Sequence, residues 1–176
     1  VAAFQGRLRG RVTAATGQHQ LQHVFQTLEA VTPEGRATLD AALRDYGAAI
    51  RAPGLVIIVS DFFHDGDIFQ GLRRLLHRGL TPVLVQVVAP EELAPDFDEA
   101  RLLDIEDPGA ATVAADGHTI ALYRRRVAEH AASLRAFCHA HGLAGVQLPS
   151  SCTFTELLQR AVRSGLLAAQ GSAGRA

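Results

Sequence analysis

The chain has 176 residues, of which 48% are hydrophobic, and a formal net charge of −1. This length predicts a single domain with a substantial core, and the hydrophobic content argues against a disordered chain. The charge gives no electrostatic attraction to nucleic acid or anionic lipid, so we expect no nucleic-acid partner and no membrane contact by this segment. Two cysteines, Cys138 and Cys152, are too few for a disulfide framework and fit reduced thiols in a cytoplasmic protein.

The first third of the chain predicts a strand end, a loop and two helices. Residues 1–4 resemble the tail of a strand whose start lies upstream, and residues 5–17 are polar, basic and broken by glycine. Helical spacing of apolar residues predicts amphipathic helices over 18–31 and 38–51. Thr38 precedes the second helix, where its hydroxyl is placed to accept hydrogen bonds from the free amides of the first turn.

The most informative segment is the aliphatic run 55–59, which leads directly into Ser60 and Asp61. A strand that is apolar at every position predicts a central parallel strand covered on both faces. Open α/β folds bind their ligands at the carboxyl edge of such strands. Asp61 is therefore the first candidate for a functional residue, and capping of the turn after the strand is the competing interpretation.

The remaining elements continue the α/β pattern. A helix over 68–79, ended by Gly79, and a buried strand over 81–88 complete a strand–helix–strand unit. We further expect an acidic loop over 91–96, a hairpin from 101–106 and 111–114, a long helix over 119–141 ended by Gly142, a strand over 145–148, a helix over 153–166 and a frayed tail over 169–176.

Clusters of titratable side chains give weaker signals. His64, Asp65 and Asp67 include hard metal ligands, but a solvated turn explains them as well. His139 and His141 are expected to interact with the terminal carbonyls of the long helix. The sequence contains no glycine-rich nucleotide-binding motif, no serine-hydrolase elbow and no zinc-protease motif.

Short motifs follow one another in an order that identifies a resemblance. They are the aliphatic strand ending at Ser60-Asp61, the second apolar strand, Pro90-Glu91-Glu92-Leu93, Leu103-Asp104-Ile105-Glu106, and the long helix with its early Tyr123. In this order the chain resembles a bacterial family of unknown function, numbered fifty-eight among such families. With Gly35-Arg36-Ala37-Thr38-Leu39 before a helix, it also resembles the second half of a von Willebrand factor A domain.

The resemblance implies an α/β fold with a mostly parallel, Rossmann-like (von Willebrand factor A-like) sheet flanked by helices. It makes residues 1–168 one domain that is truncated at its N-terminus and lacks its first strand or strands. Domains of this type carry a metal-ion-dependent adhesion site, in which a DxSxS segment, a Thr and an Asp surround Mg²⁺. Thr38 and Asp61 match the last two, and the DxSxS segment would lie upstream of Val1. One hydroxyl and one carboxylate are too few, so we expect Mg²⁺ in the full-length protein and none bound by this chain alone.

The function implied by the resemblance is a protein-interaction module and not an enzyme. Family members are often encoded beside MoxR-type AAA+ ATPases, so such an ATPase is the expected partner, and membrane helices upstream in the full-length protein are compatible with it. Two alternatives stay open. One is a metal-dependent hydrolase or phosphotransferase that uses Asp61, although no general base stands at a fixed spacing from it. The other is a structural half-domain without a site.

Overall fold

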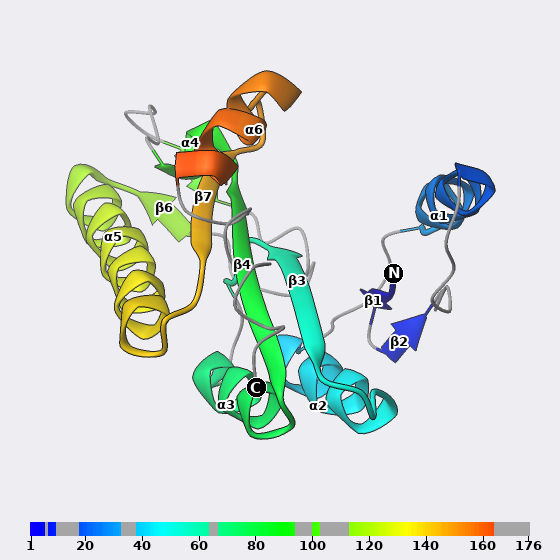
Figure 1. Ribbon diagram of the computed structural model, residues 1–176. Helices are drawn as coiled ribbons and strands as arrows, with labels where there is room; N and C mark the ends of the chain where they lie inside the picture. Colours follow the sequence, from blue (N-terminus) through cyan, green and yellow to red (C-terminus); the bar gives the residue numbers. More distant parts are fainter. Residues whose placement is uncertain are drawn as a thin grey trace. The chain divides into compact units, whose positions relative to one another are not determined.

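A computed structural model describes residues 1–5, 7–9, 18–32, 38–63, 67–93, 100–102 and 113–163 (Figure 1). Within these residues the fold is α/β, with a three-stranded, all-parallel open sheet and flanking helices, which confirms the predicted Rossmann-like class. The strands are β1 (Ala3–Gln5), β2 (Arg7–Arg9), β3 (Gly54–Ser60), β4 (Leu80–Val88), β5 (Ala100–Leu102), β6 (Val113–Ala115) and β7 (Gly145–Pro149). The helices are α1 (Gln18–Glu29), α2 (Leu39–Ala49), α3 (Ile68–His77), α4 (Pro90–Leu93), α5 (Gly117–Ala140) and α6 (Phe154–Arg163).

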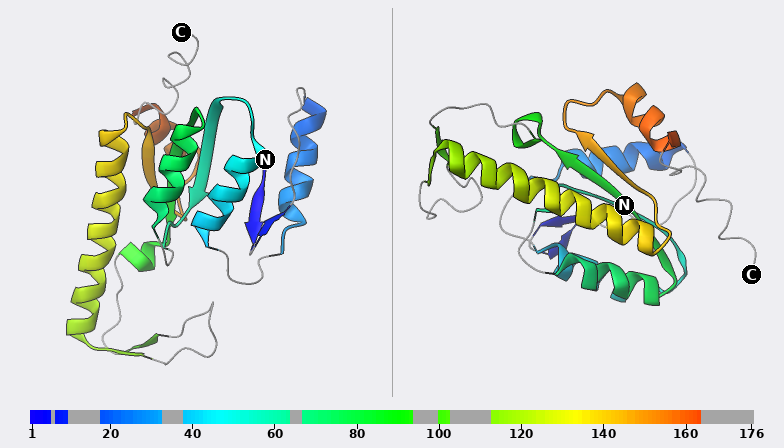
Figure 2. Two further views of the ribbon diagram at one scale, coloured as in Figure 1. Left: turned by 90° about the horizontal axis from the view of Figure 1, so that it is seen from below. Right: turned by 90° about the vertical axis from the view of Figure 1, so that its left-hand side faces the viewer.

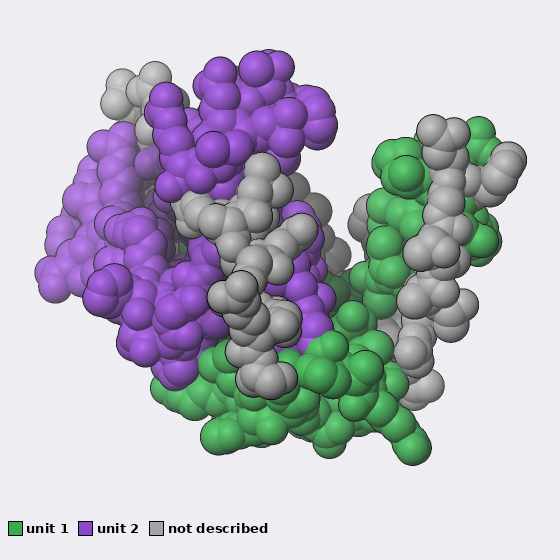
Figure 3. Space-filling view, in the orientation of Figure 1, with its two compact units in different colours: residues 1–53, 63–79 green, residues 54–62, 80–176 purple. Residues whose placement is uncertain are grey.

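The chain divides into two compact units, which Figure 3 colours separately. Unit 1 contains β1, β2, α1, α2 and α3, and unit 2 contains the parallel sheet, the β5–β6 hairpin, α4, α5 and α6. The single domain expected over residues 1–168 stays a prediction. The tail expected over 169–176 lies outside the described residues.

Unit 1 is centred on the close packing of α2 against α3. Both helices bury an apolar stripe, in which Leu39 and Leu43 come from α2 and Leu72 from α3. Gly71 lets the helices approach, because a Cβ atom at this position would lie 2.9 Å from Leu43 Cδ1. Gly79 follows the end of α3, as predicted. Its φ is +74°, a backbone conformation that glycine adopts without steric cost.

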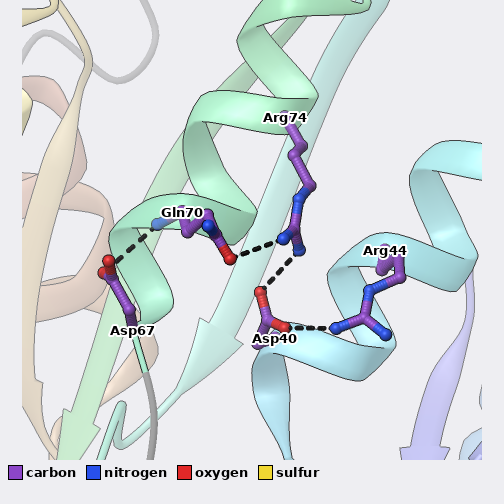
Figure 4. Close-up of polar contacts among 5 residues, drawn as sticks. All are labelled: Asp40, Arg44, Asp67, Gln70 and Arg74. Atoms are coloured by element: carbon purple, nitrogen blue, oxygen red, sulfur yellow. Dashed lines mark hydrogen bonds and ion pairs between the residues drawn. The ribbon is translucent and has the colours of Figure 1, made fainter.

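A polar network joins the exposed sides of α2 and α3 (Figure 4). Asp40 accepts hydrogen bonds from Arg44 at 2.7 Å within α2 and from Arg74 at 2.9 Å on α3. Gln70 accepts a further bond from Arg74. The network continues to Asp67, whose side chain accepts from the Gln70 backbone N–H and caps α3. Asp67 is therefore a helix cap, whereas its predicted cluster partners, His64 and Asp65, lie outside the described residues.

The sheet of unit 2 has the order β3-β4-β7. Its register pairs Ser60 with Gln86 and Leu84 with Gly145, so these residues face the same side of the sheet. Helix α5 lies along that side of the sheet (Figure 2). A Cβ atom on Gly145 would lie 3.0 Å from Cys138 Sγ of this helix. The buried stripe of α5 explains the helix: Val127, Ala131, Leu134, Phe137 and Cys138 recur at helical spacing.

The expectation that β3 is a central, fully covered strand is wrong for the described residues. β4 is the central strand and is buried along most of its length, whereas β3 lies at the edge of the sheet. On the side opposite α5, Leu55, Ile57 and Val59 are 38%, 56% and 59% exposed. An unbroken apolar run shows that both faces suit an apolar environment, but it does not specify which element covers each face.

Two short elements were predicted as loops and are regular structure. β2 pairs antiparallel with β1, with Phe4 opposite Leu8 in the register, although residues 5–17 carry no sustained periodicity. Pro90–Leu93 is a helical turn, α4, because proline suits the first helical position and Glu92 accepts the Ala89 backbone N–H at 2.8 Å. Both elements are only three or four residues long, which is too short for a periodicity search to detect.

The ends of α5 agree with the sequence. Asp116 caps its start by accepting from the Thr119 backbone N–H at 2.7 Å. Gly142 follows its end with φ +63. His141 contacts the Phe137 carbonyl through Nδ1 at 2.9 Å, as predicted for a histidine near the terminal carbonyls, and its ring stacks on the Phe137 ring.

None of the helices in the described part of the chain is long and apolar enough to cross a membrane.

Candidate functional site

The candidate site is the turn that follows β3 in unit 2. Ser60 Oγ accepts the Phe62 backbone N–H at 3.1 Å, which closes the turn, and it donates to Asp61 Oδ1 at 3.3 Å. Short serine side chains commonly form such local turns because their hydroxyl reaches the backbone two residues ahead. The Asp61 carboxylate therefore stands at the carboxyl end of a parallel strand, where the sequence places it, and it is partly exposed.

Phe62 fixes the far side of this turn. It is the one non-glycine residue with positive φ, at +63°, in the described ranges. Its side chain is only 1% exposed, so the ring is anchored in the core. A bulky residue in this region costs about 1–3 kcal/mol and persists only where the surroundings impose it. The turn that carries Asp61 is therefore held in a strained conformation by the burial of the next residue.

Gln86 holds the same turn from the neighbouring strand. It pairs with Ser60 in the register and is 5% exposed, the one buried polar residue in the part of the chain that the structure describes. Its Nε2 donates to the backbone carbonyl of Asp61 at 2.9 Å. Sequence reasoning missed this residue, although a single amide in the run 83–88, otherwise all valine and leucine, was a visible signal.

His130 reaches the turn from α5. Burial lowers the pKa of its imidazole, while a hydrogen bond with the Phe62 backbone and the negative charge of Asp61 act in the opposite direction. The histidine is half-buried and lies beside the buried stripe of α5, three residues after Val127 and four before Leu134. That spacing was a usable signal, but the contact with the β3 turn is long-range and no sequence pattern specifies it.

Thr38 stands at the N-cap position of α2, with φ −88 and ψ 127, as predicted. The predicted capping bond is wrong, because its side chain makes no cap hydrogen bond. The chain has already adopted the extended backbone of a cap residue, so the helix start does not depend on the hydroxyl. Thr38 belongs to unit 1 and Asp61 to unit 2, and their expected roles as ligands of one Mg²⁺ ion stay a prediction.

A second pair of polar residues comes from two motifs that carry the family resemblance, the Pro90–Leu93 segment after β4 and the early part of the long helix α5. Glu92 of α4 approaches Tyr123 near the start of α5. Burial raises the pKa of the Tyr123 hydroxyl, and the negative charge of Glu92 raises it further. Glu92 also serves local structure, since it accepts the Ala89 N–H.

The donor set at the β3 turn consists of oxygen ligands, the Asp61 carboxylate and the neighbouring Ser60 hydroxyl, and the His130 imidazole is close to them. Oxygen ligands suit Mg²⁺, which retains several waters and needs few protein ligands. The residues present therefore fit part of a magnesium site. A complete set does not assemble within the described ranges, which hold no group of three or more His, Cys, Asp or Glu side chains able to share an ion.

Comparison with known proteins gives one match. The family model described as "Protein of unknown function DUF58" covers residues 1–135 of the chain. No curated protein and no solved structure matches it. Residues 1–135 include Thr38, the β3 turn, Gln86 and His130, so the candidate site lies within the matched region. The protein belongs to the family of unknown function DUF58.

Proposed function

We propose that this protein is an interaction module in which Asp61 is one ligand of a metal-ion-dependent adhesion site for Mg²⁺. The observation that carries the proposal is the fixed presentation of the Asp61 carboxylate at the carboxyl end of a parallel strand. Thr38 is the second ligand, by its resemblance to the threonine of von Willebrand factor A domains. An ion held in this way keeps an open coordination position, which a carboxylate of the partner completes.

The remaining ligands come, in this proposal, from a strand that pairs with β3 and carries the DxSxS segment. The position of β3 at the edge of the sheet supports this, because its outer backbone edge can accept another strand. The exposed side chains of Ile57 and Val59 support it too, since a neighbouring strand and its connection would cover apolar surface there. The DxSxS strand is expected in sequence that precedes Val1.

Calorimetric titration with Mg²⁺ tests the metal site. The 176-residue chain should release no binding heat at millimolar concentrations, whereas a chain extended with its own upstream sequence should bind. Asp61→Ala and Thr38→Ala should abolish binding in the extended chain, and Asp45→Ala, which removes an equally charged exposed residue of α2, should not. Undiminished binding by Asp61→Ala would overturn the assignment.

The proposed partner is a MoxR-type AAA+ ATPase, on the basis of the gene neighbourhoods that the family resemblance implies. Capture of such an ATPase by the extended protein should require Mg²⁺ and should be lost in EDTA and in Asp61→Ala. Equal capture with and without metal would show that partner binding does not depend on the adhesion site.

The alternative is a metal-dependent hydrolase or phosphotransferase that uses Asp61. The half-buried imidazole of His130, close to the Asp61 turn, is the observation that favours it, because an imidazole can act as the general base that the sequence lacked at any fixed spacing. A screen for phosphate-ester hydrolysis by the extended protein separates the two proposals. Turnover that disappears in both Asp61→Ala and His130→Gln, without metal-dependent capture of a partner, would establish the enzyme.

A further inference from the structure

We propose that Gln86 is the positioning residue of this site: its side-chain amide holds the backbone of Asp61 and so directs the carboxylate toward the carboxyl edge of the sheet. The inference deepens the proposed function and rests on it, since it assigns to β4 a role in presenting a ligand that β3 carries. Nothing in the sequence motifs of the chain assigns a role to Gln86.

The burial of Gln86 is the first argument. An amide that is removed from water costs free energy unless its hydrogen-bonding groups find partners. Gln86 lies in the central strand, with Leu84 and Val88 at the flanking positions on the same face, all three of them buried. An aliphatic residue would satisfy the core equally well. What glutamine adds is the 2.9 Å bond from Nε2 to the Asp61 carbonyl oxygen.

The second argument is that the restraints on the turn act on different atoms. Ser60 Oγ holds the Phe62 N–H, the buried Phe62 ring holds the left-handed backbone, and Gln86 holds the carbonyl between them. The carbonyl of Asp61 belongs to the peptide plane that links Asp61 to Phe62. Because β3 fixes the chain up to Ser60, holding this carbonyl oxygen restrains φ and ψ of Asp61 together. The angle φ of Asp61 sets the direction in which its side chain leaves the backbone, and ψ sets the path of the turn that follows.

The experiment compares Gln86→Leu with Gln147→Leu in the 176-residue chain. Gln147 is the register partner of Gln86 on β7, so the control makes the same chemical change on the same face of the sheet. In Gln86→Leu we expect the carbonyl-carbon NMR shift of Asp61 to change, and exchange of the Asp61 and Phe62 amide hydrogens to accelerate about threefold to tenfold. In Gln147→Leu both quantities should stay at the wild-type value.

Gln86→Glu distinguishes the hydrogen bond from simple packing. An ionised glutamate has the shape of glutamine but cannot donate to a carbonyl, whereas a protonated one can. The protection of the Asp61 and Phe62 amides should therefore be low at about pH 7 and recover toward wild type at about pH 5, because burial raises the pKa of the introduced carboxyl. The wild-type chain is measured at each pH, and the ratio of variant to wild-type exchange is reported.

Several outcomes overturn the positioning role. These are an unchanged Asp61 carbonyl shift and exchange in Gln86→Leu, equal changes in Gln147→Leu, and protection in Gln86→Glu that does not respond to pH. Magnesium titration of the extended chain keeps the two proposals apart. Gln86→Leu should weaken Mg²⁺ binding about tenfold, by misdirecting the ligand. If Asp61→Ala leaves binding intact while Gln86→Leu still loosens the turn, the metal site fails and the positioning of Asp61 stands.

Discussion

Phe62 combines a left-handed backbone with a buried ring, so two opposing free-energy contributions meet in one residue. Removal of the ring leaves a cavity, which costs about 3–5 kcal/mol for a buried phenylalanine. Replacement by glycine also removes the backbone strain, which is about 1–2 kcal/mol for a residue that carries a Cβ atom. Alanine removes the ring but keeps most of the strain.

The first prediction is that Phe62→Gly is more stable than Phe62→Ala, by about 1 kcal/mol in urea unfolding. This reverses the usual order, because glycine ordinarily destabilises a folded chain relative to alanine. Ala132→Gly on the exposed side of α5 is the control, and there the glycine variant should be less stable by about 1 kcal/mol. The usual order at both positions would mean that the turn is not strained.

The second prediction concerns Asp116, the cap of α5. Side-chain and backbone hydrogen bonds to Thr119 hold the pKa of its carboxyl below the usual aspartate range. A lowered folded pKa contributes stability that is present above the unfolded pKa and is lost as the pH falls through the folded pKa. Asp116→Ala should therefore unfold a few degrees below wild type at neutral pH, and the difference in Tm should shrink in acid. Asp116→Asn can still accept the hydrogen bond, so its Tm should stay closer to that of the wild type. A Tm difference between Asp116→Ala and wild type that does not change with pH would contradict the role of the charge.

At the scale of elements, α2 and α3 are joined by shape more than by charge. The ion pair between Asp40 and Arg74 is partly exposed, and such pairs contribute about 0–1 kcal/mol. The close approach at Gly71 removes apolar surface of Leu43 and Leu72 from water, and each fully buried leucine contributes about 1.5–3 kcal/mol. The missing side chain at Gly71 therefore matters more than the polar network above it.

The third prediction follows from that contact. Gly71→Ala should lower the free energy of unfolding by about 1 kcal/mol, because overpacking against Leu43 outweighs the gain in helix propensity. Gly117→Ala is the matched control, since a Cβ atom there meets nothing within 4 Å, and it should be neutral or stabilising. Stabilisation by Gly71→Ala would mean that α2 and α3 can move apart without loss of stability.

The accuracy of the sequence predictions also differs by element. The helices α1, α2, α3 and α5 were predicted within a few residues, because an apolar stripe repeats over several turns in each. β2 and α4 were missed because three or four residues carry too little periodicity. The place of β3 at the sheet edge could not be predicted, since strand order depends on partners far away in sequence.

The candidate site shows the same limit. Asp61 could be predicted, because a strand that ends in a carboxylate is a local pattern and the carboxyl edge is a general binding position. Gln86 and His130 reach the turn through the register of β4 and the packing of α5, and neither is encoded near Asp61. A sequence therefore indicates the ligand more readily than the residues that hold it.

At the scale of the whole molecule, the exposed edge of β3 favours association between chains. An edge strand with alternating exposed apolar residues is a template for pairing with another chain. Leu55, Ile57 and Val59 form such a row on the face opposite α5.

The fourth prediction is that the 176-residue chain associates reversibly at high concentration and that Ile57→Lys restores the monomer, as measured by sedimentation velocity. Leu122→Lys is the control. Leu122 is 47% exposed, close to the 56% of Ile57, but it lies on a helix. An equal effect of the two substitutions would point to general hydrophobic association instead of pairing at the strand edge.

The register of the parallel sheet also sets an order of assembly on the ribosome. β3 pairs with β4 across the single helix α3, whereas β4 meets β7 only after α4, the β5–β6 hairpin and the whole of α5 have been synthesised. Contacts between distant segments form later because more chain entropy is lost when they close. The β3–β4 pair can thus form first, with the other edge of β4 open until Gly145 emerges. In that interval the nascent chain most needs a chaperone, and a stop codon before residue 145 would leave the central strand permanently unpaired on that side.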